Sequence, residues 1–213
     1  MYSKIFIFVF LSILSVASQV TSLEYVNNKL SKEKEMNEVR LIIIRHGQGI
    51  HNVTDCIVSS LSPGVYLTEI GVEQVKKSAI ELGEQKIDYI YVSPVYRTLQ
   101  TAQIIGMALN IPYQKLIVDD KLREQFFGDF EGKTWSEYNA YFSKEKIQLM
   151  GPPNGETDLQ VWRRTLKSLM EIVKKHPKET ILIVTHGFNY QIISKILIGK
   201  SLHPKTAEYF IFD

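Results

Sequence analysis

Two apolar runs in this sequence each end in a histidine that is followed at once by a glycine. The run RLIIIRHG ends at Arg45, His46 and Gly47, and the run TILIVTHG ends at His186 and Gly187. An imidazole can act as a nucleophile or move a proton, and a guanidinium group binds anions through a fixed set of donors. We interpret the glycine beside each histidine as space for a ligand to approach the backbone. These residues predict nucleophilic chemistry at a cationic site.

Two further residues extend this hypothesis. Arg97 lies three positions after Pro94, at the predicted start of a helix, and Glu124 lies in the loop after the third predicted strand. Ligands of open α/β sheets bind beyond the carboxyl ends of the strands, which is where these side chains fall. Burying such a cationic cluster without an anion would be costly. Each residue alone is more often structural than catalytic, so their shared position carries the hypothesis, and phosphate is the expected dianion.

Apolar runs that predict strands alternate along the chain with amphipathic segments that predict helices. The predicted strands are residues 39–46, 86–94, 111–120 and 179–187. Short continuous apolar runs are typical of strands that are buried on both faces. The alternation therefore predicts an α/β fold with three layers, in which a mostly parallel sheet is covered by helices on both faces.

Capping residues predict where three of the helices begin. Thr68 is a predicted N-cap, Ser93 is a second with Pro94 in the first turn, and Thr157 with Gln160 has the spacing of a capping box. The apolar faces predicted for the first and third helices are Val72, Val75, Ala79 and Leu82, and Trp162, Leu166, Leu169 and Val173.

The overall composition is that of an ordinary globular chain. It has 213 residues, a formal net charge of +2 and 45% hydrophobic residues. This length suits one domain, and the near-neutral charge gives no basic surface for a nucleic acid partner. Cys56 is the single cysteine, which excludes an internal disulfide and a metal site built on cysteines.

The first residues of the chain form a segment of a different kind. Lys4 precedes an apolar run from Ile5 to Val16, and small residues follow. As a helix this run would be about 18 Å long, which is shorter than the ~30 Å hydrocarbon core of a bilayer. The pattern predicts a signal peptide over residues 1–18, with no stable membrane insertion after cleavage; an uncleaved anchor is the alternative. Residues 19–38 are interpreted as a polar spacer or solvated helix, and residues 39–213 as the folded domain.

Six blocks of the sequence, taken in order, resemble a known family. The blocks are RHGQGIHN, YLTEIGVEQ, SPVYRTLQTA, KLREQFFGDFEG, PPNGETDLQVWRR and VTHG. They resemble the histidine phosphatase superfamily, in its phosphatase type, and the match extends from about residue 39 to residue 199. The resemblance implies the phosphoglycerate-mutase-like fold for the domain.

The resemblance also implies a role for each candidate residue. His46 would be the nucleophile that forms a phosphohistidine, and Glu124 would protonate the leaving alcohol and later take a proton from water. The residues that it implies for binding and stabilising the phosphoryl group are Arg45, Asn52, Arg97, His186 and Gly187. No metal ion and no other cofactor are expected, because the two arginines supply the positive charge.

Some residues depart from the family pattern or fall outside it. Gln48 replaces the glutamate that is more frequent after RHG. His51 is interpreted as a supporting or surface histidine, with substrate contact as the alternative. His176 is interpreted as a decoration of a helix end, His203 as a loop residue and Cys56 as a small loop residue. The chain ends at AEYFIFD, where the family usually has a further edge strand, so that strand is expected to be short or abbreviated.

These observations predict an enzyme that hydrolyses a small-molecule phosphomonoester. A phosphoglycerate mutase is the main rival, and an inactive relative that only binds phosphorylated ligands is a second. The aromatic residues that follow Glu124 could line the pocket or simply pack together; they are Phe126, Phe127, Trp135, Tyr138, Tyr141 and Phe142. The leader predicts an exported protein, periplasmic or secreted. The sequence leaves the substrate and the oligomeric state open.

Overall fold

The computed structural model describes residues 25, 27–30, 32, 38–59, 65–142 and 151–213. Its centre is a five-stranded sheet with the order β3-β2-β4-β1-β5. Four strands are parallel, and β5 at one edge runs antiparallel to β1. The strands are β1 (Arg40–Arg45), β2 (Tyr89–Val92), β3 (Leu116–Val118), β4 (Thr180–Thr185) and β5 (Tyr209–Phe212).

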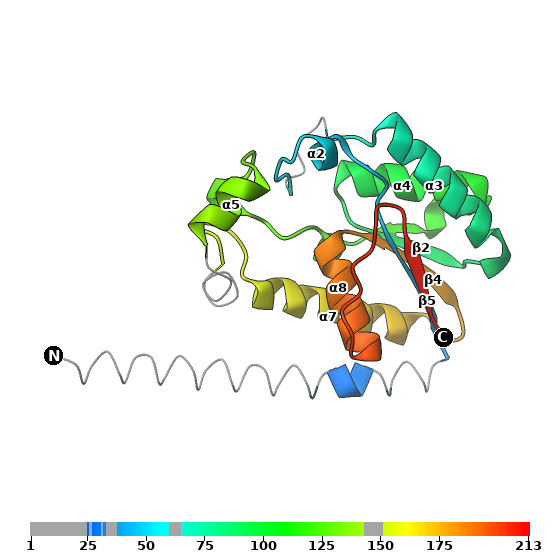
Figure 1. The fold of residues 1–213 in the computed structure, drawn as a ribbon. Helices are drawn as coiled ribbons and strands as arrows, with labels where there is room; N and C mark the ends of the chain where they lie inside the picture. Colours follow the sequence, from blue (N-terminus) through cyan, green and yellow to red (C-terminus); the bar gives the residue numbers. More distant parts are fainter. Residues whose placement is uncertain (1–24, 26, 31, 33–37, 60–64, 143–150) are drawn as a thin grey trace.

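Helices cover both faces of this sheet, as Figure 1 shows. The helices α3 (Glu69–Leu82) and α4 (Tyr96–Ala108) pack on one face, and α7 (Asp158–Lys175) and α8 (Gly187–Ile198) pack on the other. The shorter helices are α2 (Ile50–Val53) and α5 (Trp135–Tyr141), with 3₁₀ turns at Gly83–Gln85, Tyr113–Lys115, Asp120–Leu122 and Gly128–Phe130. The prediction of a three-layer α/β/α fold is therefore confirmed.

Strand β1 shows why this sequence forms a sheet buried on both sides. In β1, Leu41 and Ile43 belong to the core under α7 and α8, whereas Ile42 and Ile44 belong to the core under α3 and α4. All four side chains are fully buried. Because successive side chains of a strand point to opposite faces, an unbroken apolar run satisfies both layers at once.

Two of the three predicted N-caps are confirmed by the structure. The Thr68 side chain accepts from the Gly71 amide, and Thr157 forms a capping box with Gln160, as predicted. The prediction for Ser93 was wrong, because α4 begins later, with Val95 as its N-cap. The Ser93 hydroxyl pairs instead with a histidine of the site described below.

Three other sequence interpretations are resolved by packing. Trp162 is only half-buried beside the core, whereas the sequence placed it on the buried face of α7. The edge strand expected near the C-terminus is present as β5, which is four residues long. Leu30, within the predicted polar spacer, is fully buried in the core cluster under α7 and α8. The predicted signal peptide lies outside the described residues.

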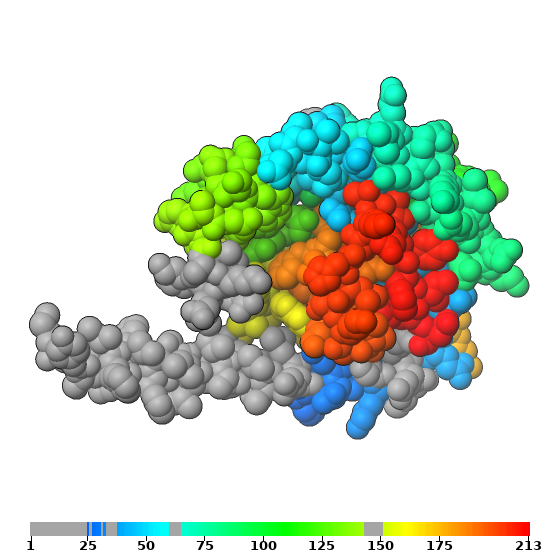
Figure 2. Space-filling view, viewed as in Figure 1, coloured from blue at the N-terminus to red at the C-terminus, as the bar shows by residue number. Residues whose placement is uncertain are grey.

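The strand order places the chemistry-bearing residues along one rim. The strand β4 lies between β1 and β2, and the carboxyl ends of all three point the same way. In the space-filling view the surface is hollowed between α5, the segment around α2, and α8 (Figure 2). Within the described residues, no helix combines the length and apolar character needed to cross a membrane.

Candidate active site

The rim of the sheet brings together five of the predicted side chains. Arg45 ends β1 and His46 follows it, while His186 follows β4 as the N-cap of α8. Arg97 is the second residue of α4. Glu124 comes from the loop that follows the 3₁₀ turn after β3, and it lies 3.7 Å from His186 between Oε2 and Nδ1. The parallel register therefore collects residues that are up to 141 positions apart.

His46 is buried, and its hydrogen bonds fix which ring nitrogen carries the proton. Its Nδ1 lies 2.7 Å from the carbonyl oxygen of Gly47, which can only accept, so Nδ1 is the donor. Its Nε2 accepts a hydrogen bond of 3.1 Å from Nε of Arg97. Burial and the neighbouring Arg97 lower the pKa of His46 well below 6.5. The imidazole is therefore neutral, with a lone pair on Nε2 as a nucleophile needs.

Gly47 has a different role from the one that the sequence indicated. A Cβ at this position would lie 2.6 Å from the carbonyl oxygen of Gly71 and 2.7 Å from Cγ2 of Val75. Both atoms belong to α3. The absence of a side chain therefore lets α3 pack against the end of β1, rather than giving a ligand access to the backbone.

Arg97 is a cation in an almost completely enclosed position. Its side chain is 1% exposed, and its Nη2 lies 3.1 Å from Nδ1 of His186. Burial, opposed by the nearby Glu124, lowers the pKa of Arg97 to about 10. Its Nη1 is buried, and none of the described residues offers it a hydrogen-bond partner. A buried cationic donor without a partner is costly unless an anion binds to it.

His186 is held between Arg97 and a serine that the sequence had assigned to a helix cap. Because guanidinium groups only donate, Nδ1 of His186 is the acceptor and Nε2 carries the proton. Nε2 then donates to the hydroxyl of Ser93 over 2.8 Å. Burial and Arg97 lower the pKa of His186 well below 6.5, so this ring is also neutral.

Arg45, the last residue of β1, presents a second guanidinium group to the site. Its Nη1 donates to the carbonyl oxygen of Pro204 at 3.0 Å, and its buried Nε has no partner among the described residues. A Cβ at Gly187 would lie 3.6 Å from Cζ of Arg45. This is an ordinary van der Waals distance, so Gly187 lies directly against the guanidinium group.

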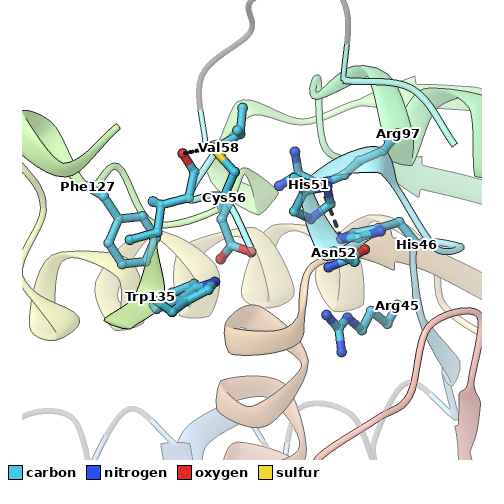
Figure 3. A pocket seen from close by; sticks show the side chains of 11 residues that line it. Arg45, His46, His51, Asn52, Cys56, Val58, Arg97, Phe127 and Trp135 are labelled. Atoms are coloured by element: carbon cyan, nitrogen blue, oxygen red, sulfur yellow. Dashed lines mark hydrogen bonds between the residues drawn. The ribbon is translucent and has the colours of Figure 1, made fainter. Parts of the chain in front are cut away.

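Arg45, His46 and Arg97 line a small cavity of about 70 Å³, whereas His186 is not among its lining residues. One water needs about 10–15 Å³ measured in this way, so the space admits a group of several heavy atoms. Figure 3 shows His46, Arg45 and Arg97 on one side of the cavity and Phe127 and Trp135 across from them. The unpaired guanidinium donors and the small volume together fit a phosphoryl group.

Two further residues line this cavity. His51 was interpreted as a supporting or surface histidine, with substrate contact as the alternative; it lines the cavity, as that alternative requires, and its ring lies 5.4 Å from that of His46. Its buried Nδ1 has no partner among the described residues, and burial beside Arg97 lowers its pKa to about 3. Cys56 lies outside the helices and strands, as interpreted, and it also lines the cavity, where its backbone bridges to Thr134. The short α2 turns the chain back over the site and brings both residues to it.

Asn52 lies at the cavity as predicted, but one end of its amide is already used. Its Oδ1 accepts from the Gly49 amide at 2.9 Å, which stabilises the start of α2. The NH₂ group is the part of the side chain suited to an anion, because it can only donate.

Glu124 stands where the small cavity opens into a larger one. It lines both cavities, and its side chain is 18% exposed. Burial raises the pKa of Glu124 above 4.5, although Arg97 opposes this shift. A carboxyl group with a raised pKa is suited to hold a proton and release it to a leaving group.

The loop that carries Glu124 is fixed by residues whose role the sequence did not reveal. Arg164 on α7 donates to the carbonyl oxygen of Glu124 at 3.0 Å and to that of Arg123 at 2.6 Å. Arg164 in turn pairs with Glu156, with Nε and Oε1 3.0 Å apart. Both residues belong to the block PPNGETDLQVWRR, which was recognised only as a resemblance.

The remaining histidines lie away from the cavity. His176 does stand at the end of α7, but it does not merely decorate it, because it is buried. Its Nε2 lies 2.8 Å from the Tyr91 hydroxyl, and its Nδ1 lies 2.6 Å from Oε2 of Glu179. His203 is exposed in the loop before β5. In the part of the chain that the structure describes, no group of three or more His, Cys, Asp or Glu side chains could hold a metal ion.

A neutral imidazole with an unprotonated Nε2, a buried and a partly buried guanidinium group and a protonatable carboxyl define a site for phosphoryl transfer. Residues 41–208 match the model of the histidine phosphatase superfamily, branch 1. The chain therefore belongs to this superfamily, as its sequence blocks predicted, and it is a phosphatase.

Individual relatives agree with this assignment. The chain is 32% identical to putative phosphoserine phosphatase 2 of Hydrogenobacter thermophilus over 76% of its own length and 80% of the relative. It is 30% identical to the metal-independent phosphoserine phosphatase of Arabidopsis thaliana, over 73% and 66% of the two chains. Its fold resembles that of YhfR from Bacillus stearothermophilus with a TM-score of 0.67 and 27% identity, covering 81% and 90% of the two chains.

Proposed function

We propose that this chain hydrolyses small-molecule phosphomonoesters through a phosphohistidine on Nε2 of His46, without a metal ion. The observation that carries the proposal is the unprotonated Nε2 of His46, which accepts only from Arg97, beside buried donors on Arg45 (Nε) and Arg97 (Nη1) that have no partner among the described residues. The two guanidinium groups supply the charge stabilisation for which other phosphatases use a metal. The five residues that the chemistry needs are all present: Arg45, His46, Arg97, Glu124 and His186. Their presence favours an active enzyme over an inactive relative that only binds phosphorylated ligands.

In the first step, Nε2 of His46 attacks phosphorus as the bond from phosphorus to the ester oxygen breaks. Arg97 releases its hydrogen bond to Nε2 and, with Arg45, binds the phosphoryl oxygens. His186, whose Nδ1 accepts from Arg97, orients that guanidinium group. Glu124, protonated because burial raises its pKa, gives its proton to the departing alcohol oxygen.

In the second step, a water molecule attacks the phosphohistidine from the side that the alcohol has left. The Glu124 carboxylate takes a proton from this water as the bond between phosphorus and Nε2 breaks. Inorganic phosphate leaves, and His46 returns to its neutral form with a lone pair on Nε2. Glu124 thus ends each cycle protonated, as it began.

The architecture favours hydrolysis over the mutase reaction. A mutase must exclude water from its phosphoenzyme until the phosphoryl group has been transferred. Here Glu124 is partly exposed at a cavity of about 550 Å³. The chain available to cover it is short: 61 residues separate Glu124 from His186, α7 and β4 take up part of them, and we interpret the segment 133–150 as the possible cover. Its described part, α5, packs on the aromatic cluster of Phe127 and Phe130.

We expect release of inorganic phosphate to exceed isomerisation of 3-phosphoglycerate by at least an order of magnitude. The assay measures both rates with purified protein in excess EDTA, and the isomerisation is primed with 2,3-bisphosphoglycerate. Loss of activity in EDTA that added metal restores would contradict the metal-independent mechanism. Isomerisation that clearly outruns phosphate release would instead establish a mutase.

We also propose that the protein is exported and that its leader is removed. The support is the residue pattern of positions 1–18 together with the position of Asn52. Asn52 begins the sequence Asn-Val-Thr, a glycosylation motif, and it lines the phosphate cavity. A glycan there would obstruct the cavity, which favours a bacterial periplasm or exterior over a eukaryotic secretory route.

Fractionation of the native host with N-terminal sequencing tests this location. We expect the protein in the periplasm or the medium, with cleavage after residue 17 or 18. Recovery of the chain from the cytosol with residues 1–18 intact would contradict export, and recovery from the membrane with the leader intact would indicate an anchor.

A further inference from the structure

The larger cavity beside Glu124 has a lining that the phosphate site does not explain. Four aromatic side chains contribute to it: Phe127, Trp135, Tyr138 and Phe188. Among its described lining residues, the charged ones are Arg45, Glu124 and Asp158. Arg45 and Glu124 serve the phosphoryl group. Asp158 is therefore the charge that remains to meet the rest of the substrate.

Asp158 is held in a fixed position without a cationic partner. It is the first residue of α7, and its Oδ1 accepts a hydrogen bond of 3.2 Å from Nε2 of Gln125. Gln125 is 5% exposed and is itself anchored, because Nε2 also donates to the carbonyl oxygen of Glu156 at 2.8 Å. No Lys, Arg or His of the described chain forms an ion pair with Asp158.

The surroundings of Asp158 favour a cation in this cavity. Burial raises the pKa of Asp158, as expected for a carboxylate that has lost water without gaining a cation. Burial and the charge of Asp158 together raise the pKa of Tyr138 to about 12, so that hydroxyl stays neutral. Aromatic faces attract ammonium groups, and a half-buried carboxylate does so more strongly.

We infer that the larger cavity binds the cationic end of an amino-alcohol phosphomonoester, with Asp158 and the aromatic side chains as its partners. The inference rests on the proposed function, since the ester oxygen must reach Glu124. The complete site is then dipolar: guanidinium groups bind the phosphate, and Asp158 binds the ammonium group. A substrate with a carboxylate in place of the ammonium group would put two anions together.

Asp158 also suits the first turn of a helix for electrostatic reasons alone. The variant Asp158→Asn separates the two roles, because the amide oxygen can still accept from Gln125 while the charge is removed. Asp129→Asn is the matched control: Asp129 is exposed on the 3₁₀ turn Gly128–Phe130, bonds to Asn154, and lines neither cavity.

The test compares 2-aminoethyl phosphate, n-propyl phosphate and carboxymethyl phosphate, which differ mainly in the charge of the far end. We expect kcat/KM to fall in that order for the wild type. Asp158→Asn should lower kcat/KM for 2-aminoethyl phosphate by roughly tenfold, mainly through KM, and change that for n-propyl phosphate less than about twofold. Phosphocholine extends the series and shows whether the aromatic faces accept a quaternary ammonium group.

Each outcome decides a separate claim. Equal use of n-propyl and 2-aminoethyl phosphate by the wild type, or an equal loss for both in Asp158→Asn, would overturn the inference and leave the hydrolytic function intact. An equal effect of Asp129→Asn on 2-aminoethyl phosphate would reduce the effect to general surface charge and would also overturn it. Failure to release phosphate from any of these esters or from 4-nitrophenyl phosphate would contradict the proposed function itself.

Discussion

Replacing His46 with asparagine is expected to lower kcat by roughly 10⁴-fold or more, the scale seen when a nucleophile is removed. The loss should be this large because the described cavity aligns one neutral ring nitrogen beside two guanidinium groups, and asparagine offers no equivalent lone pair. Binding of inorganic phosphate should change much less, because Arg45 and Arg97 remain. Steady-state kinetics and phosphate inhibition measure the two effects separately.

A trapping experiment connects this loss to the proposed intermediate. Rapid quenching with ³²P-labelled substrate should give an adduct on the wild type that is labile in acid and stable in base. The adduct should be absent from His46→Asn and present in His203→Asn, which changes an exposed histidine away from the cavity. A labelled His46→Asn protein would identify another nucleophile, and His51 is the first to test because its ring lies 5.4 Å from that of His46.

Replacing Glu124 with glutamine is expected to slow the hydrolysis of alkyl phosphates by roughly 10²–10⁴-fold, the usual contribution of a proton donor. With 4-nitrophenyl phosphate the first step should remain fast, because nitrophenolate leaves without a proton. The second step should still be slow, because no carboxylate takes the proton from water. Stopped-flow measurements should therefore show a burst of nitrophenolate equal to the enzyme concentration, followed by slow turnover.

The role of Glu124 as a proton donor also predicts how kcat depends on pH. Glu124 must be protonated for the first step. Because burial raises its pKa, the protonated form persists above pH 4.5. His46 must be neutral, and because burial and Arg97 lower its pKa, the neutral form persists below pH 6.5. For alkyl phosphates, kcat should fall as pH rises through the pKa of Glu124, and this decline should be absent from Glu124→Gln.

Glu137→Gln is the matched control for this variant. Glu137 is exposed at the start of α5, where it completes a capping box with Thr134, and glutamine can serve the same cap. Its kinetics and pH profile should match those of the wild type. A Glu124→Gln enzyme that loses activity equally on alkyl and nitrophenyl phosphates, with no burst, would show that Glu124 has no role in protonating the leaving group.

The sequence by itself determined the layers and the main rim of the site. Short uninterrupted apolar runs such as Leu41–Ile44 are typical of strands covered on both faces, and their alternation with amphipathic helices predicts a parallel sheet, as observed. In such a sheet, residues that directly follow parallel strands must lie along one rim. The positions of His46 and His186 could therefore be predicted from local pattern alone. Local caps such as that of Thr157 were predictable because both partners lie within one helical turn.

Only the tertiary structure decided the partners that hold those residues. Ser93 reads locally as a helix cap, but its hydroxyl binds His186, which is 93 positions away. Gly47 reads as space for a ligand, yet the space is filled by α3. His51 enters the cavity because α2 folds over it, and Asp158 faces the larger cavity because α7 begins there. These outcomes depend on contacts between distant segments, and a side chain with several energetically similar local choices takes the one that packing offers it.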